Sequence, residues 1–183
     1  GYGYYVPENV VTNDDLSKLM TTNDEWITER TGIKERRHRK NRNDSEETTA
    51  FLAKKAAEKA LEKANLTAKD LDFIVIATLS PDYFFQGSGV VIQEMLGCDT
   101  IGALDVRNQC SGFVYSMSVA DAFIKAGTYK NVLVVGAEVH SFGLDFTDDG
   151  RGVSVIFGDG AGAIILSASE DENEEGVLAV NMH

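Results

Sequence analysis

Cys110 lies between a predicted strand and a predicted helix, in the segment LDVRNQCSGFVYSM (Leu104 to Met117). A cysteine is most often a small buried apolar residue, and that is the structural alternative here. At the first turn of a helix, however, unpaired backbone N–H groups and the positive dipole end stabilise a thiolate. The small neighbours Ser111 and Gly112 leave room for a substrate. This placement favours a reactive thiol over the structural alternative. A carbonyl oxygen bound there could also receive a backbone N–H, as the oxyanion hole of an acyl-transfer site requires.

The second cysteine, Cys98, follows Gly97 in a predicted turn that no helix start follows, so we interpret it as structural. The two cysteines are twelve residues apart, and the chain has neither a leader pattern nor a run of eighteen apolar residues. This combination is typical of an intracellular protein with free thiols. We expect a cytoplasmic protein without a membrane partner.

Seven of the seventeen basic residues fall within thirteen positions of an acidic chain. A solvated loop would explain this run. Beside Trp26, the run would also suit a ligand with phosphates and a stackable ring, because guanidinium groups pair with phosphate and stack on aromatic faces. Composition does not decide between the two. The net charge of −12 repels polyanions, so we expect no nucleic-acid partner. The seven residues are Arg30, Lys34, Arg36, Arg37, Arg39, Lys40 and Arg42.

Gly158, Gly160 and Ala163 fit the dinucleotide-binding pattern G-x-G-x-x-A. That pattern needs a helix directly after the turn, whose N-terminus holds a pyrophosphate. The residues AIILS follow here and predict a strand instead. We interpret the glycines as a hairpin turn, and expect neither a nucleotide cofactor nor a metal.

The elements that would position these residues alternate between strand and helix from residue 72 onward. Continuous β-branched runs predict buried strands, and apolar residues at helical spacing predict helices. The order β-α-β-α-β favours one α/β domain with a parallel sheet and helices on both faces. We expect strands over 72–78, 100–106 and 131–138, two strands around the glycine turn within 153–169, and a last strand over 176–182. We expect helices that begin at residue 12 or 13 and after Asn23, and helices over 45–64, 88–96 and 112–127.

Four segments carry a family resemblance, in this order: DEWITERTGIKERR (24–37), NQCSGFVYSMSVA (108–120), GAEVHS (136–141) and FGDGAGAIIL (157–166). Together they resemble the amino-terminal half of beta-ketoacyl-ACP synthase III, the initiating condensing enzyme of type II fatty acid synthesis. The resemblance covers nearly the whole chain. It implies a thiolase-like fold, with two similar α/β halves in one chain and a homodimer. Residues 1–183 would form one half, a mixed and mostly parallel sheet with helices on both faces.

The resemblance also implies roles for individual residues. Cys110 matches the nucleophile that takes an acyl group from acyl-CoA before malonyl-ACP condenses with it and loses carbon dioxide. Trp26 and Arg151 match the pair that sandwich the adenine of CoA. In SPDYFFQG, Phe85 matches a phenylalanine that reaches across the dimer to the partner's acyl pocket. Three further residues match positions at or beside the nucleotide end of the CoA site: Arg30, Thr31 and Gly152.

The chain departs from the family pattern before the nucleophile and after the phenylalanine. Gln109 stands where the family has a small residue, and Gln86-Gly87 stand where it has proline-serine, so the acyl-chain preference stays open. The family's catalytic histidine and asparagine lie in its second half, and no histidine of this chain matches that position. We therefore expect the chain to be part of a longer enzyme. Its histidines are His38, His140 and His183.

Three functions from different classes remain open. The first is a condensing acyltransferase that uses acyl-CoA and malonyl-ACP, with acyl carrier protein as partner and no cofactor. The second is a non-catalytic half that binds acyl-CoA or carrier protein and pairs with a separate chain. The third is another thiolase-superfamily enzyme, such as a thiolase or hydroxymethylglutaryl-CoA synthase. The segment TGIKERR (31–37) favours the first, with Arg36 and Arg37 as further candidate contacts for CoA phosphate or carrier protein.

Overall fold

A computed structural model describes residues 1–41, 46–169 and 176–182. Within these residues, one sheet contains five strands: β1 Tyr2–Tyr5, β4 Phe73–Ala77, β5 Gly102–Val106, β6 Asn131–Glu138 and β7 Gly160–Ser167. Their order is β1-β7-β6-β4-β5. β4 is parallel to β5 and β6, whereas β7 is antiparallel to β6 and β1. Only β7 therefore opposes the other four described strands, and the predicted mixed, mostly parallel sheet is confirmed.

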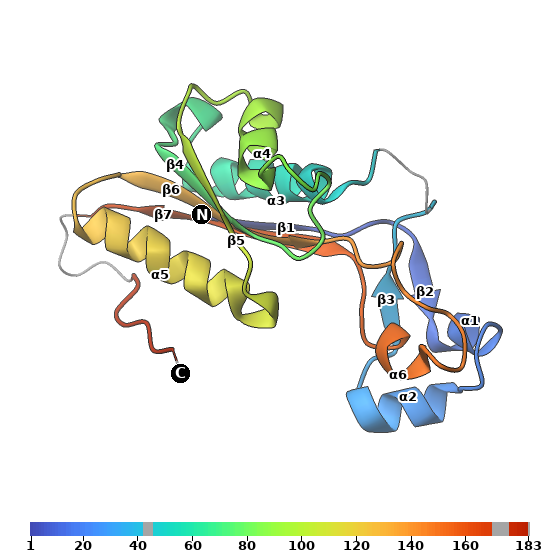
Figure 1. Ribbon diagram of the computed structural model, residues 1–183. Helices are drawn as coiled ribbons and strands as arrows, with labels where there is room; N and C mark the ends of the chain where they lie inside the picture. The colour runs from blue at the N-terminus through green and yellow to red at the C-terminus, as the bar shows by residue number, and fades with distance from the viewer. Residues whose placement is uncertain (42–45, 170–175, 183) are drawn as a thin grey trace.

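Helices cover both faces of this sheet: α3 Thr49–Ala64 and α4 Ser88–Leu96 on one face, and α5 Gly112–Lys125 on the other (Figure 1). Successive side chains of β4 point alternately into the cores on the two faces of the sheet. Ile74 and Ile76 pack in the α3 and α4 core, while Phe73 and Val75 pack in the α5 core. All of β4 is buried, because a central strand between two helical layers loses its exposure on both faces.

The helix α3 lies close to the edge strand β1. A Cβ at Gly3 would stand 2.3 Å from the carbonyl oxygen of Ala56, so only glycine allows this approach. The helix begins at Thr49, where Thr48 caps it and Asp82 accepts the N–H groups of the first two residues. The predicted start at residue 45 lies outside the described residues.

A smaller lobe at the right of Figure 1 carries the segment around Trp26. The predicted helix starts in this lobe are confirmed, since Thr12 caps the first helix and Asn23 caps the second. Apolar side chains from three parts of the chain form its core, among them Leu16 and Val155. The elements of the lobe are β2 Val10–Thr12, α1 Asn13–Ser17, α2 Asp24–Thr31, β3 Glu35–Arg37 and α6 Arg151–Ser154.

Two of the predicted strands are wrong. The segment before the glycine turn forms the end of α6 and a turn, because the Ser154 hydroxyl donates to the Asp145 carbonyl and Val155 enters the lobe core. These tertiary contacts outweigh the β-propensity of the valines and isoleucine. Residues 176–182 form no strand, since none of the described strands pairs with them and a strand needs a partner for its backbone groups. The strand predicted after the glycine turn is confirmed as β7.

Candidate active site

Cys110 lies on the connection between β5 and α5. Gln109–Ser111 form a short 3-10 helix, and Gly112 directly begins α5. The residue is exposed, which argues against the alternative of a buried structural cysteine. Figure 1 shows that this end of α5 points toward the smaller lobe.

No described side chain caps the first turn of α5. Ser111, which precedes the helix, makes no capping bond, and its hydroxyl bonds to Asn108 instead. By contrast, Asp105 accepts the N–H groups of Ser88 and Gly89 at the start of α4. No side chain in the described part of the chain accepts from the first turn of α5. The N–H of Gly112 donates to the Gln109 carbonyl, and the positive end of the helix dipole can stabilise a thiolate or a negatively charged oxygen at Cys110.

The backbone around Cys110 is fixed by close packing and by one strained residue. A Cβ at Gly112 would lie 3.0 Å from the Ala77 Cβ, so the helix starts directly against β4. A Cβ at Gly136 would lie 3.1 Å from the Phe113 ring, which seats the next residue of α5 on β6. Gln109 has φ of 44°, a left-handed conformation that is uncommon outside glycine. Such strain persists only where the surroundings hold it, so the thiol occupies a defined place.

Trp26, Arg30 and Arg151 meet in the smaller lobe. The guanidinium carbons of Arg30 and Arg151 each lie 4.6 Å from the centre of the Trp26 ring. Arg30 comes from the next turn of α2, whereas Arg151 comes from α6. Guanidinium groups at this distance are attracted to the face of an indole. The fold therefore brings the predicted adenine-binding pair together.

The other predicted nucleotide contacts differ in how available they are. The Thr31 hydroxyl donates to the Ile27 carbonyl at 2.7 Å and accepts from the Ile33 N–H, so it is used within the end of α2. Gly152 is exposed, and a Cβ there would meet no atom within 4 Å. Space beside Arg151 is therefore open.

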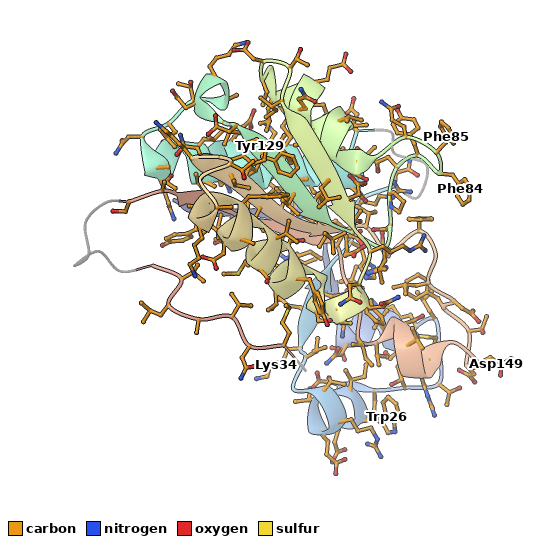
Figure 2. The ribbon with its side chains drawn as sticks, turned by 60° about the vertical axis from the view of Figure 1, so that its left-hand side comes forward. Trp26, Lys34, Phe84, Phe85, Tyr129 and Asp149 are labelled. Carbon is orange, nitrogen blue, oxygen red and sulfur yellow. The ribbon has the colours of Figure 1, made fainter. Side chains whose placement is uncertain are left out.

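Phe85 lies at the tip of the loop between β4 and α4. Phe84 and Phe85 are fully exposed, at 102% and 101%, and they project away from the lobe that carries Trp26 (Figure 2). Large apolar side chains with no cover of their own are typical of contact surfaces. Phe85 can therefore contact another chain, but it does not take part in the proposed CoA site around Trp26.

The basic run does not form one surface. Arg36 is only 6% exposed, and its guanidinium donates to Asn13 Oδ1 at 2.8 Å and to the Val155 carbonyl at 3.0 Å. Burial lowers the pKa of Arg36. The hypothesis that Arg36 contacts an external phosphate or carrier protein is therefore wrong, because it ties β3 to the lobe core. Arg37 is half-buried, and Arg42 lies outside the described residues.

The described histidines contact residues near the start of β7. His38 is buried, and its Nε2 lies 3.3 Å from the Phe157 carbonyl oxygen. The His140 ring packs on Phe157, and its Nε2 lies 3.6 Å from a Glu138 carboxylate oxygen. None of these described contacts joins a histidine to Cys110. His183 lies outside the described residues.

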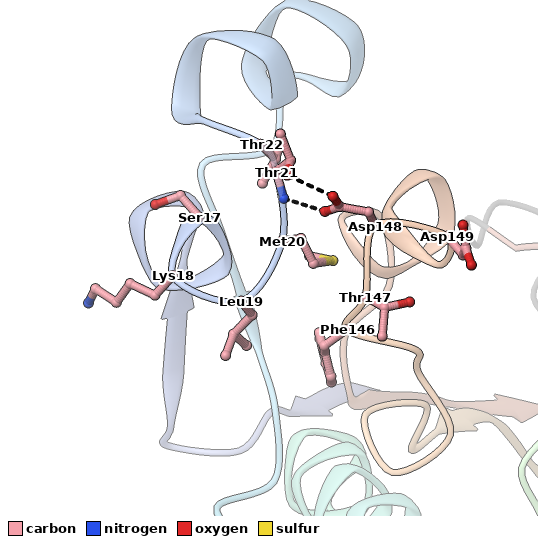
Figure 3. A pocket seen from close by; sticks show the side chains of 10 residues that line it. All are labelled: Ser17, Lys18, Leu19, Met20, Thr21, Thr22, Phe146, Thr147, Asp148 and Asp149. Carbon is pink, nitrogen blue, oxygen red and sulfur yellow. Dashed lines mark hydrogen bonds between the residues drawn. The ribbon is translucent and has the colours of Figure 1, made fainter.

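A pocket of about 690 Å³ lies beside the Trp26 cluster, between Ser17–Thr22 and Phe146–Asp149 (Figure 3). On its rim, the Asp148 carboxylate accepts hydrogen bonds from the backbone N–H and the hydroxyl of Thr21. Arg151 donates to the carbonyl of the same threonine at 2.6 Å. Sequence reasoning missed Asp148 and Thr21, because they are 127 positions apart and no local pattern connects them.

Within the described ranges, no group of three or more histidine, cysteine, aspartate or glutamate side chains could hold a metal ion. Nor is any described helix long and apolar enough to cross a membrane.

Comparisons of the sequence and of the structure with known proteins both find synthases III of the beta-ketoacyl-ACP (3-oxoacyl-ACP) type. The family model of 3-oxoacyl-[acyl-carrier-protein (ACP)] synthase III matches residues 104–183. The whole chain aligns with beta-ketoacyl-ACP synthase III of Aquifex aeolicus, at 47% identity and 56% of that protein's length. The corresponding protein of Psychromonas ingrahamii is 49% identical over 54% of its length. Over its whole length, the chain is similar to the beta-ketoacyl-ACP synthases III.

A solved structure confirms the fold class. The crystal structure of 3-oxoacyl-[acyl-carrier-protein] synthase III from Aquifex aeolicus matches with a TM-score of 0.88 and 48% identity, over 94% of this chain and 54% of that one. The resemblance inferred from the four motifs and the thiolase-like fold are thereby confirmed. The chain spans about half the length of the curated relatives it matches.

Proposed function

We propose that the full-length protein carrying these residues is a condensing acyltransferase of the beta-ketoacyl-ACP synthase III type. It takes an acyl group from acyl-CoA onto Cys110 and condenses it with malonyl-ACP, with loss of carbon dioxide, to initiate fatty acid synthesis in the cytoplasm. The observation that carries this proposal is the exposed Cys110 before a helix whose first turn has no side-chain cap. The names of the relatives at 47% and 49% identity support the reaction class.

The acylation step follows from this geometry. The Cys110 thiolate forms a bond to the acyl carbon, and the electron pair of the broken carbon–sulfur bond leaves on the CoA thiolate. The tetrahedral intermediate carries its negative charge on the former carbonyl oxygen. The backbone N–H of Cys110 and the positive dipole end of α5 stabilise that charge. Metal or cofactor chemistry forms no part of this proposed step.

The CoA site uses the cluster in the smaller lobe. Adenine stacks between Trp26 and Arg151, while Arg30, Thr31 and Gly152 line the nucleotide end. Each guanidinium carbon lies 4.6 Å from the centre of the Trp26 ring, which leaves no space for a base between them, so Arg151 moves away from the indole when adenine enters. Planar guanidinium groups that stack on an indole can also stack on a base. The open space at Gly152 leaves room for the ligand backbone.

Residues 1–183 act as the amino-terminal half of a two-half enzyme in this proposal, and the second half supplies a histidine and an asparagine. Decarboxylation develops negative charge on the malonyl thioester oxygen, so hydrogen-bond donors must point there. The exposed side chains Val114 and Tyr115 on α5 support a second half on this side of the sheet.

The active form in this proposal is a homodimer, with Phe85 bounding the partner's acyl pocket. β5 is an edge strand of the sheet, and Leu104 on it is exposed. The unpaired backbone groups of such an edge favour pairing with another chain. The fully exposed Phe84 and Phe85 precede α4, which packs beside the same strand. The edge of β5 and the loop with Phe84 and Phe85 together form a surface that a second copy of this chain can cover.

The test is a condensation assay with the full-length protein, acetyl-CoA and malonyl-ACP, in which carbon dioxide and ketoacyl-ACP are measured. Cys110→Ser should lower the rate by about 1,000-fold or more, since removal of a nucleophile costs at least this much. The matched variant Cys98→Ser should keep the rate. A full rate with Cys110→Ser would contradict the proposal. Binding of CoA without any product from the unmodified protein would favour the non-catalytic alternative.

A further inference from the structure

Thr21 forms hydrogen bonds through its backbone N–H, its hydroxyl and its carbonyl with two residues at the start of α6 and just before it. Its N–H and hydroxyl donate to the Asp148 carboxylate, the hydroxyl at 2.7 Å. Its carbonyl accepts from Arg151, whose guanidinium also lies over the Trp26 ring. Figure 3 shows the two Asp148 bonds spanning the edge of the pocket. One threonine therefore fixes the approach of two segments that are far apart in sequence.

These bonds connect the two segments that carry Trp26 and Arg151, the proposed adenine-binding pair. Thr21 lies two residues before Asn23, the cap of α2, and Trp26 sits in the first turn of that helix. Arg151 is the first residue of α6 and follows Asp148 closely. A shift of Asp148 away from Thr21 would thus move Arg151 relative to Trp26. A stacking site tolerates little change, because the ligand ring must touch both planes.

The surroundings of Asp148 indicate that it positions Thr21 and contributes little to the stability of the folded lobe. Thr21 and Asp148 are both exposed, and the core of the lobe is formed by other residues, among them Leu16 and Ile27. Exposed hydrogen bonds and ion pairs contribute little to folding. The bonds from Thr21, and then the charge of Arg151, lower the pKa of Asp148, so its carboxylate is ionised at neutral pH. The bonds to Thr21 are therefore formed under working conditions.

We infer that Asp148 is a positioning residue for CoA binding: it holds Thr21, whose carbonyl accepts from Arg151, and so keeps Arg151 beside Trp26 at the proposed adenine site. This inference rests on the proposed function, since it concerns the same CoA site. Asp148 contacts neither the reacting thiol nor the acyl group in this account.

The test compares Asp148→Asn with Asp149→Asn in the full-length protein. Both variants remove one negative charge from the same exposed segment, but only Asp148 bonds to Thr21. Calorimetry with CoA should show roughly 2-fold to 30-fold weaker binding for Asp148→Asn, the range typical of residues that act through others. Asp149→Asn should bind CoA at least as tightly as the unmodified protein.

A second measurement separates positioning of CoA from general damage. Acetylation of Cys110 by S-acetyl-N-acetylcysteamine, a thioester without a nucleotide, should proceed at the same rate in both variants. Thr21→Val, which keeps the N–H bond and loses the hydroxyl bond, should weaken CoA binding less than Asp148→Asn does. Equal CoA affinity in Asp148→Asn and Asp149→Asn, while the unmodified protein binds CoA, would overturn this inference alone. Slower acetylation by the small thioester in Asp148→Asn would also overturn it, and a lack of CoA binding by the unmodified protein would overturn the proposed function as well.

Discussion

Replacing Trp26 by alanine tests the proposed CoA site in the smaller lobe. Stacking of a base on an aromatic side chain contributes about 1–3 kcal/mol, which corresponds to about a 5-fold to 150-fold loss of affinity. The structure sharpens this expectation. Trp26 is half-buried against the lobe core that contains Leu16 and Ile27, so alanine also removes packing. Trp26→Phe keeps an aromatic plane at the same place, and should retain most of the affinity that Trp26→Ala loses.

The assay is calorimetry with CoA and, separately, with pantetheine, which lacks the nucleotide. Trp26→Ala and Arg151→Ala should weaken CoA binding and leave pantetheine binding unchanged, because only the nucleotide reaches the stacked pair. Thermal unfolding of each variant shows whether the lobe is still folded. Unchanged CoA affinity in both folded alanine variants would refute the placement of adenine between Trp26 and Arg151.

Two further predictions concern the backbone before the nucleophile and the response to acid. Gln109→Val should slow alkylation of Cys110 by iodoacetamide, because a β-branched residue is strained at φ of 44°, while Gln109→Gly should keep the rate within about twofold; equal rates in the two variants would contradict a positioning role for this residue. Hydrogen bonds from Thr67 lower the pKa of Asp70, so this carboxylate stabilises the folded state above the usual carboxyl pKa, and the contribution is lost as pH falls through the lowered value. When the pH is lowered below about 4, the melting temperature should therefore decrease, and it should decrease less in Asp70→Asn than in the unmodified protein. An identical decrease in the two proteins would contradict this role of Asp70.

The sequence predicts those elements whose pattern is local. The apolar run of β4 and the caps Thr12 and Asn23 are read correctly, since burial on two faces and helix capping leave a signature within a few residues. The position of Cys110 before α5 follows from the same local reasoning. For the candidate site, therefore, the nucleophile could be proposed without the structure.

Features that depend on distant contacts could not be read in this way. Arg36 belongs to a charged run, but alternation along β3 turns it into the lobe core and leaves Glu35 exposed. The segment that forms α6 has the composition of a strand, and contacts with Asp145 outweigh that preference. The bonds between Asp148 and Thr21 have no sequence signature at all. In each case, the deciding partner lies far along the chain.

Mapping of the acyl group after incubation with acetyl-CoA tests the central claim most directly. The full-length protein would be incubated with acetyl-CoA, digested, and its cysteine peptides identified by mass spectrometry. Cys110 is exposed before an uncapped helix, whereas Cys98 is partly buried and burial raises its pKa. The account predicts an acetyl group on Cys110 and none on Cys98. Acetylation of Cys98, with Cys110 unmodified by acetyl-CoA and by longer acyl-CoA thioesters, would contradict it.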